Sequence, residues 1–333
     1  MDRVLAVDLG GTWLRAALVD LRGGRILARQ RCATPLGGPE PLLEAIDALI
    51  ARLAAELADH GGDPIEPDLP IGLACPGPLD PDSGTTDGLP NLPGFADFPL
   101  AARVTSITGR YCRLHNDASL AALGEAWLGA GRGYDPLLYV TWSTGIGGGI
   151  VLDGRLFGGA KGLAGEIGHL VTQDGGPRCA LGHAGCAEGI GSGSGIARRA
   201  RARLAQPDGE GVALAVALRE AGAAAPDAVD ARMVSRAALA GDPTCRQLMR
   251  EAARATGLAL AGAVNLIDPA RIVIGGGVAR GSWSQLMPEL QRSLAQSVLA
   301  WDRRAIDLVP AALGDDAGLL GAARLLALER GAA

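Results

Sequence analysis

Lysine is almost absent from this sequence: of its 31 basic residues, Lys161 is the only lysine and the other 30 are arginine. A phosphate-binding P-loop has the pattern GxxxxGK[ST], in which the lysine contacts the phosphates. Lys161 lies in Gly159-Ala160-Lys161-Gly162, which does not fit this pattern. If the chain binds a nucleotide, it is therefore not a P-loop protein.

Long apolar runs and basic tracts are also missing. Apolar segments such as 212–218 are far shorter than the roughly 18 residues of a membrane helix, and the first apolar run meets Asp8 too soon for a signal peptide. The net charge of −5, without a basic tract, argues against nucleic-acid binding. The six cysteines show no spacing typical of a secreted disulfide framework. We expect a cytoplasmic protein with reduced thiols and without a nucleic-acid or membrane partner.

Glycine, in contrast, is abundant: it accounts for 50 of the 333 residues, roughly twice the usual share of about 7%. The glycines fall between apolar periodic segments without a G-X-Y repeat, which excludes collagen. At about 150 residues per domain, the length favours two domains. Strand-like and helix-like segments alternate, which indicates an α/β protein.

One local pattern occurs once in each half of the chain. Predicted strands over 4–8 and 14–20 join at Gly10-Gly11 in a tight hairpin. A strand over 137–142, a glycine turn and a second strand over 150–152 repeat that arrangement. The repeat predicts two related domains. Apolar spacing predicts helices over 41–58, 118–130, 196–205, 243–264 and 315–329.

The glycine turns have the composition of phosphate-binding sites. Consecutive glycines let a ligand approach the backbone, whose N–H groups bind anions. In Asp8-Leu9-Gly10-Gly11-Thr12 a carboxylate adjoins the turn, and a carboxylate beside phosphate requires a cation such as Mg²⁺ between them. The second turn adds the hydroxyls of Ser143 and Thr144. Two such turns could hold a polyphosphate from both sides, although each could also be a plain hairpin turn.

The order of the motifs resembles the ROK family of sugar kinases. The motifs that carry the resemblance are Asp8-Leu9-Gly10-Gly11-Thr12, Asn116-Asp117-Ala118, Thr144-Gly145-Ile146-Gly147-Gly148-Gly149, Gly165-Glu166-Ile167-Gly168-His169 and Gly185-Cys186-Ala187-Glu188. The resemblance implies the two-domain actin-like (ribonuclease H-like) ATPase fold, with the active site in the interdomain cleft, and a homodimer. It places a smaller domain at 1–117 plus 314–333 and a larger one at 118–313.

The resemblance also implies the site residues. The residues expected to bind ATP, together with Mg²⁺, are Asp8, Gly10, Gly11, Thr12, Thr144, Gly145, Gly147, Gly275, Gly276 and Gly277. The residues expected to bind the sugar are Asn91, Asn116, Asp117, Glu166, His169 and Glu188. Asp117 is the expected catalytic base, whereas spacing alone favours it as the N-cap of the helix over 118–130. Taken singly, the glutamates could be surface charges and the histidine a structural side chain.

The chain departs from the family at a metal site. ROK proteins commonly hold a structural zinc with the motif histidine and three cysteines in a CxCGxxGC loop. Here the corresponding residues are His169, Cys179 and Cys186, because Leu181 replaces the middle cysteine. Structural zinc requires four ligands. His183 could supply the fourth from a different loop position, or the loop could hold no zinc and pack around Leu181. Trp13, after the first glycine turn, is a second departure, since a polar or basic residue is usual there.

The activity implied by the resemblance is ATP-dependent phosphorylation of the 6-hydroxyl of a hexose, with glucose as the first choice. An N-acetylmannosamine or N-acetylglucosamine kinase and then a fructokinase are the alternatives. The motifs do not separate these sugars, because tolerance of an N-acyl group depends on the shape of the loop over 76–91. Some ROK proteins are sugar-sensing repressors, which carry a helix-turn-helix of about 60 residues before the first glycine-turn strand. Here that strand begins at Val4, which argues against a repressor.

Overall fold

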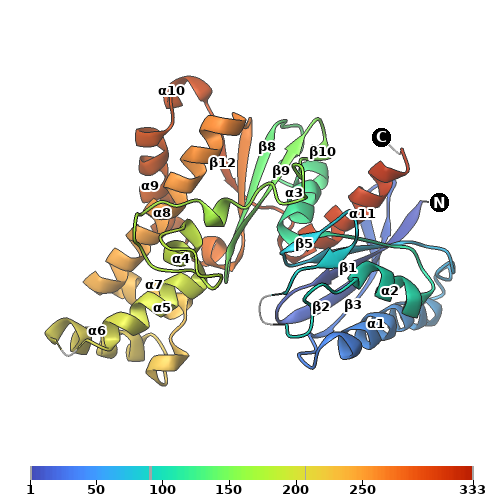
Figure 1. The fold of residues 1–333 in the computed structure, drawn as a ribbon, viewed down its shortest axis with the longest axis horizontal. Helices are drawn as coiled ribbons and strands as arrows, with labels where there is room; N and C mark the ends of the chain where they lie inside the picture. Colours follow the sequence, from blue (N-terminus) through green and yellow to red (C-terminus); the bar gives the residue numbers. More distant parts are fainter. Residues whose placement is uncertain (1, 90–91, 207, 332–333) are drawn as a thin grey trace. The chain divides into compact units, whose positions relative to one another are not determined.

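The computed structural model describes residues 2–89, 92–206 and 208–331, which form an α/β protein (Figure 1). The strands are β1 (Arg3–Leu9), β2 (Trp13–Asp20), β3 (Arg25–Ala33), β4 (Ile71–Cys75), β5 (Leu79–Asp80), β6 (Thr85–Thr86), β7 (Cys112–Asn116), β8 (Leu137–Trp142), β9 (Ile146–Leu152), β10 (Arg155–Leu156), β11 (Arg271–Gly275) and β12 (Asp307–Pro310). The α-helices are α1 (Pro39–Asp59), α2 (Leu100–Thr108), α3 (Asp117–Leu128), α4 (Ala187–Gly191), α5 (Gly193–Leu204), α6 (Gly209–Glu220), α7 (Ala231–Ala240), α8 (Pro243–Ile267), α9 (Gly277–Ser297), α10 (Trp301–Arg304) and α11 (Ala317–Glu329). Short 3₁₀ helices cover η1 (Ile167–His169), η2 (Pro226–Ala228) and η3 (Gly314–Asp316).

Two five-stranded sheets have the same strand order. The first runs β3-β2-β1-β4-β7 and the second β10-β9-β8-β11-β12. Numbered along the chain within each sheet, both read 3-2-1-4-5. In the first sheet β1 pairs antiparallel with β2 and parallel with β4, and β4 pairs parallel with β7. The predicted repeat of strand, glycine turn and strand is therefore present in both sheets. The second turn is shorter than predicted, because β9 already begins at Ile146 and includes Gly147, Gly148 and Gly149.

The chain divides into two compact units. One contains Met1–Tyr139, Gly149–Gly165 and Ala311–Ala333, and the other contains Val140–Gly148 and Glu166–Pro310. The first unit includes α3, whereas the sequence analysis placed a boundary at residue 117. That division into 1–117 plus 314–333 and 118–313 stays a prediction.

In the first unit the sheet lies between two helical layers (Figure 1). Alternate residues of β1 point to opposite faces, as in any strand. Leu5 and Val7 pack with α1 and α2, whereas Val4 and Ala6 pack with α3 and α11. Apolar residues spaced three and four positions apart give α1 one buried face. Pro39 suits the first turn of α1, because an N–H group there would have no partner within the helix and proline has none.

Helices α3 and α11 approach each other closely through glycine. A Cβ atom added at Gly321 would overlap the carbonyl oxygen of Leu120, and one added at Gly124 would overlap that of Ala317. Only a residue without a side chain permits this spacing. The contact fixes the N-terminal end of α11 beside the sheet.

The second unit is built around α8, whose buried face contacts α4, α7 and α9. Asp242 caps α8 by accepting a hydrogen bond from the Cys245 amide at 2.7 Å. Among the described residues, no helix has the length and apolar composition needed to span a bilayer.

Candidate active site

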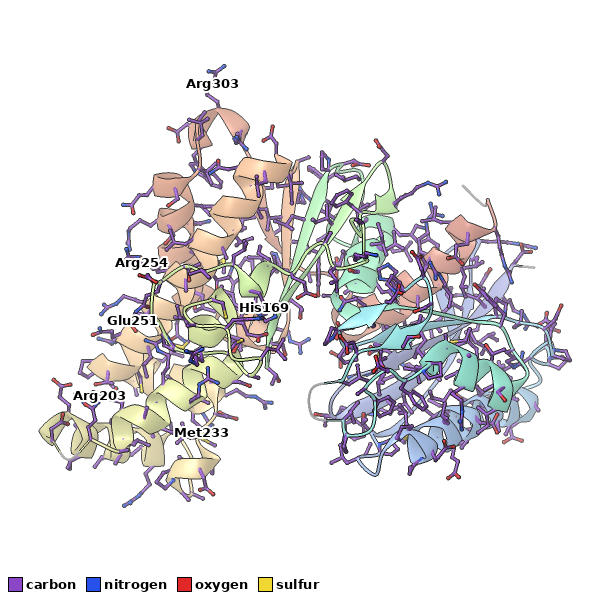
Figure 2. The ribbon with its side chains drawn as sticks, viewed as in Figure 1. His169, Arg203, Met233, Glu251, Arg254 and Arg303 are labelled. Atoms are coloured by element: carbon purple, nitrogen blue, oxygen red, sulfur yellow. The ribbon has the colours of Figure 1, made fainter. Side chains whose placement is uncertain are left out.

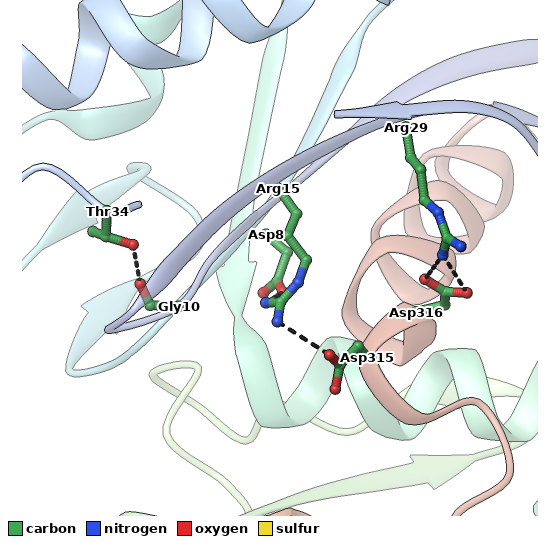
Figure 3. Close-up of polar contacts among 7 residues, drawn as sticks. All are labelled: Asp8, Gly10, Arg15, Arg29, Thr34, Asp315 and Asp316. Carbon is green, nitrogen blue, oxygen red and sulfur yellow. Dashed lines mark hydrogen bonds and ion pairs between the residues drawn. The ribbon is translucent and has the colours of Figure 1, made fainter. Parts of the chain in front are cut away.

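Asp8 and Arg15 form an ion pair at the end of the first hairpin (Figure 3). They are directly opposite each other in the register of β1 and β2. Arg15 Nη1 donates to Asp8 Oδ2 at 3.1 Å, and Arg15 Nη2 donates to Asp315 Oδ2 at 3.3 Å. Burial raises the pKa of Asp8 to about 6, against the opposing effect of Arg15. Among the described residues, the poorly solvated Asp8 carboxylate thus has one basic partner, Arg15.

The turn that follows Asp8 is exposed and closed by short hydrogen bonds. The amide of Gly10 donates to the carbonyl of Trp13 at 3.0 Å, and Thr34 Oγ1 donates to the carbonyl of Gly10 at 2.6 Å (Figure 3). Gly11 and Thr12 are exposed at its tip. The backbone at this position can therefore approach a ligand, as the sequence analysis expected of a phosphate-binding turn.

Asn116 and Asp117 lie where β7 meets α3. The N-cap of α3 is Asn116, whose Oδ1 accepts from the Ser119 amide at 3.0 Å. Asp117 is the first helical residue, and its Oδ1 accepts from the Ala118 amide at 2.7 Å. The capping role that spacing assigned to Asp117 therefore belongs to its neighbour Asn116.

Asp117 lies in an environment suited to a base. Burial raises the pKa of Asp117 above its ordinary value, and the hydrogen bond from Ala118 only partly offsets this. The charge of Asp117 also contributes to the raised pKa of Asp8. The two carboxylates therefore act on each other within the first unit. Carboxylate oxygens are the protein ligands that Mg²⁺ prefers, so these residues fit a Mg²⁺–nucleotide complex.

In the second unit, Gly275–Gly277 lie against the turn that follows β8. Gly276 has a φ of 91°, and a Cβ atom there would overlap the backbone of Trp142. One added at Gly277 would lie 3.7 Å from Ser143 Oγ. Gly276 is also the N-cap of α9, so the first amides of this helix, which kinks at Ser282, adjoin the turn after β8. A helix N-terminus beside a glycine turn is a favourable position for phosphate.

Glu188 links that turn to the predicted sugar-binding segment. Its Oε2 accepts from the Ile146 amide at 3.1 Å. A Cβ atom at Gly145 would lie 2.7 Å from the same oxygen, so a side chain there would push the Glu188 carboxylate away from its present position. Glu188 is thus held in place by the backbone rather than being a free surface charge.

Glu166 and His169 face each other across η1, as their spacing predicts. Figure 2 labels His169 within the second unit. His169 Nε2 lies 3.9 Å from Glu166 Oε2. The other ring nitrogen, Nδ1, lies 3.2 Å from His183 Nδ1 and 4.0 Å from Cys179 Sγ. The two nitrogens of His169 therefore face two different groups.

His169, Cys179 and His183 have the spacing of metal ligands. Their ligand atoms all lie within 4.8 Å of one another. Tetrahedral zinc with Zn–N bonds of about 2.0–2.1 Å separates two nitrogens by about 3.3 Å and a nitrogen from a sulfur by about 3.6 Å. The observed separations of 3.2 and 4.0 Å are close to these values. Cys186 follows in the same loop, where burial and, to a lesser degree, Cys179 raise the pKa of its thiol. Among the described residues the group thus offers three donors, one fewer than structural zinc takes.

The structure places the predicted residues in two groups. Asp8, the first glycine turn, Asn116 and Asp117 belong to the first unit, whereas the turn after β8, Gly275–Gly277, Glu166, His169 and Glu188 belong to the second. Asn91 lies outside the described residues. Sequence reasoning missed Arg15, although counting residues back along the predicted hairpin would have placed it opposite Asp8. It also missed Asp315, for which the sequence offers no local signal.

A family model described as the ROK family matches residues 4–329. The chain belongs to the ROK family. Its mixed α/β structure with two sheets is the actin-like ATPase fold of ROK sugar kinases, as the resemblance implied.

Known ROK proteins resemble this chain over almost its whole length. A glucokinase of Thermotoga maritima is 32% identical over 97% of this chain and 97% of its own. An N-acetylmannosamine kinase of Shigella flexneri is 33% identical over 98% of this chain and 99% of its own. The crystal structure of a ROK glucokinase from Streptomyces griseus in complex with glucose and AMPPNP matches with a TM-score of 0.78 and 33% identity, covering 97% of this chain and 98% of that one.

Proposed function

We propose that this ROK protein is an ATP-dependent hexose kinase that phosphorylates the 6-hydroxyl of glucose. The observation that carries the proposal is the pair of Asp8 and Asp117, two poorly solvated carboxylates in the unit that also carries the first glycine turn. The similarity to a glucokinase crystallised with glucose and AMPPNP supports the same substrates for this chain.

Each group has a role that its chemistry suits. Phosphoryl transfer depends mainly on positioning and on neutralising charge, and it needs a base near the attacking hydroxyl. Asp117 is that base, because a raised pKa makes a carboxylate a better proton acceptor. The glycine turns and the N-terminus of α9 bind the ATP phosphates through backbone amides. Mg²⁺, held at Asp8, neutralises phosphate charge when bound.

The sugar hydroxyls are bound by the other predicted residues. Asn116, Glu166, His169 and Glu188 offer carboxylate, amide and imidazole groups, and we assign the same role to Asn91. Glu188 is held against the turn at Ile146, so its free lone pairs have a set direction.

N-acetylmannosamine is the second candidate substrate. The relative from Shigella flexneri is a kinase of that sugar and matches this chain as well as the glucokinases do. The replacement of the middle zinc-binding cysteine by Leu181 also favours N-acetylmannosamine, since some kinases of that sugar lack the full set of zinc ligands.

A coupled ADP-release assay across sugars tests this function and the base. We expect the highest kcat/KM with glucose among glucose, N-acetylmannosamine, N-acetylglucosamine and fructose. Asp117→Asn should lower kcat by about 10²-fold or more while leaving ATP binding intact. Asp59→Asn, on the exposed end of α1, is the matched control and should leave turnover unchanged.

Two results would reject the proposal. Undiminished turnover of Asp117→Asn would remove Asp117 as the base. A higher kcat/KM with N-acetylmannosamine would replace glucose as the substrate.

We further propose that zinc binds His169, Cys179 and His183, with Cys186 as the fourth ligand. His183 then substitutes for the cysteine that Leu181 replaces. A metal on Nδ1 of His169 leaves its proton on Nε2, which faces Glu166, so the metal would orient a sugar-binding pair.

Metal analysis tests this assignment. The purified protein should contain about one zinc per chain, and His183→Ala should lose most of it while His60→Ala, at the exposed end of α1, should not. Equal zinc content in His183→Ala and wild type would exclude His183 as a ligand.

We also propose a cytoplasmic homodimer, as the family resemblance implies. Light scattering coupled to gel filtration measures the mass against the 33.8 kDa of one chain.

A further inference from the structure

Arg15 connects two carboxylates that lie 307 positions apart in the sequence, Asp8 and Asp315 (Figure 3). The side chains of Arg15 and Asp8 are only 20% and 15% exposed, whereas that of Asp315 is 63% exposed. The inner pair is therefore shielded from solvent much more than the outer one. Shielding strengthens the attraction between Arg15 and Asp8, because less water screens it.

The guanidinium also lies beside the first glycine turn. A Cβ atom added at Gly10 would be 3.7 Å from Arg15 Nη1. Phosphates bound by this turn would thus be within reach of the same cation. An arginine binds phosphate as well as carboxylate, because its planar fork presents two parallel N–H donors.

One oxygen of the Asp8 carboxylate already binds a cation, the guanidinium of Arg15. A Cβ atom added at Gly318 in α11 would lie 3.3 Å from the other oxygen, Oδ1, so this glycine keeps a side chain away from it. On the other side Arg15 donates to Oδ2 at 3.1 Å. Mg²⁺ requires oxygen ligands at about 2.0–2.1 Å and keeps several waters. A metal on Oδ2 would therefore repel the guanidinium and displace it.

We propose that Arg15 competes with Mg²⁺ for the Asp8 carboxylate, so that the metal binds tightly only when nucleotide phosphates take over the guanidinium. The ligand that releases Asp8 is a nucleoside di- or triphosphate at the glycine turn. This inference rests on the proposed kinase function. It gives Arg15 a positioning role that replaces the lysine of a P-loop and makes the binding of metal and nucleotide cooperative.

Titration of the full-length protein with Mn²⁺, followed by electron paramagnetic resonance without sugar, tests this competition. We expect Arg15→Met to bind Mn²⁺ alone about tenfold more tightly than wild type, because a partly buried competing charge is gone. Saturating AMPPNP should raise the Mn²⁺ affinity of wild type more than that of the variant. Arg29→Met is the matched control: it removes the ion pair with Asp316 at 3.2 Å but no contact to Asp8, and it should bind Mn²⁺ like wild type.

The double variant Arg15→Met/Asp8→Asn shows where the metal binds. The gain in affinity should disappear in it. Equal Mn²⁺ affinity of wild type and Arg15→Met overturns the proposal, and so does a gain that survives the loss of Asp8. Arg15→Gln, which keeps a polar group at the site, is the second variant and should show the same gain if Arg15→Met does not fold. Because no turnover is measured, failure here is separate from failure of the sugar kinase assay.

Discussion

At the residue scale, burial changes the pKa of His115, which lies in β7 two residues before Asp117. Its Nδ1 accepts a hydrogen bond from the Asn116 amide at 2.9 Å. Burial, helped by the charge of Arg113, lowers the pKa of His115 from 6.5 to about 4. The folded protein keeps this ring neutral at pH values where the unfolded chain protonates it. The stability that this contributes is full above pH 6.5, falls progressively as the pH drops below that value and is lost completely by about pH 4.

Denaturant unfolding at two pH values measures this effect. Between pH 7.5 and pH 5, wild type should lose about 2 kcal/mol more unfolding free energy than His115→Gln, which cannot titrate. The comparison cancels the other titrating groups, since both proteins share them. Parallel losses in the two proteins would mean that His115 takes up a proton as readily in the folded state.

At the element scale, the contact of α3 with α11 positions the segments that carry Asp117 and Asp315. The helix α3 begins at Asp117, and α11 follows directly after Asp315 in η3. Buried Glu125 adds to the contact, because its carboxylate accepts from the amides of Ala312 at 3.1 Å and Leu313 at 2.8 Å. The geometry at Asp8 therefore depends on how closely two helices pack.

Gly321→Ala should disturb this packing. Its methyl group would overlap the Leu120 carbonyl oxygen, which is backbone and cannot rotate away. We expect a loss of unfolding free energy of about 1–3 kcal/mol, or more if the helices cannot separate. Gly281→Ala in α9, where a Cβ atom meets nothing within 4 Å, is the matched control and should not destabilise the protein. Equal melting temperatures of the two variants would contradict the close approach.

At the scale of the whole molecule, the two sheets repeat one topology. Both have the strand order 3-2-1-4-5, and in each the first two strands flank a glycine turn. An open sheet with this order brings the ends of its central strands to one edge, where ligands of α/β proteins bind. Asp8, next to last in β1, and Trp142, last in β8, each lie near the carboxyl end of the central strand of their own sheet. The repeated topology explains why a glycine turn after the first strand of a sheet occurs twice along one chain.

The sequence by itself determined the features that depend on near neighbours. Short spacings predicted the hairpin at Gly10-Gly11, a helix over 118–130 and the pairing of Glu166 with His169, because turn chemistry and helical periodicity act over a few residues. The order of such local motifs along the chain was enough to predict the family.

Only the tertiary structure decided the contacts between distant segments. It brought Asp315 to Arg15, packed α11 against α3 and set His183 next to His169 in a loop whose cysteine pattern is incomplete. It also gave the N-cap of α3 to Asn116 rather than Asp117. Such contacts depend on how buried faces and charges pack in three dimensions, which spacing along the chain does not encode.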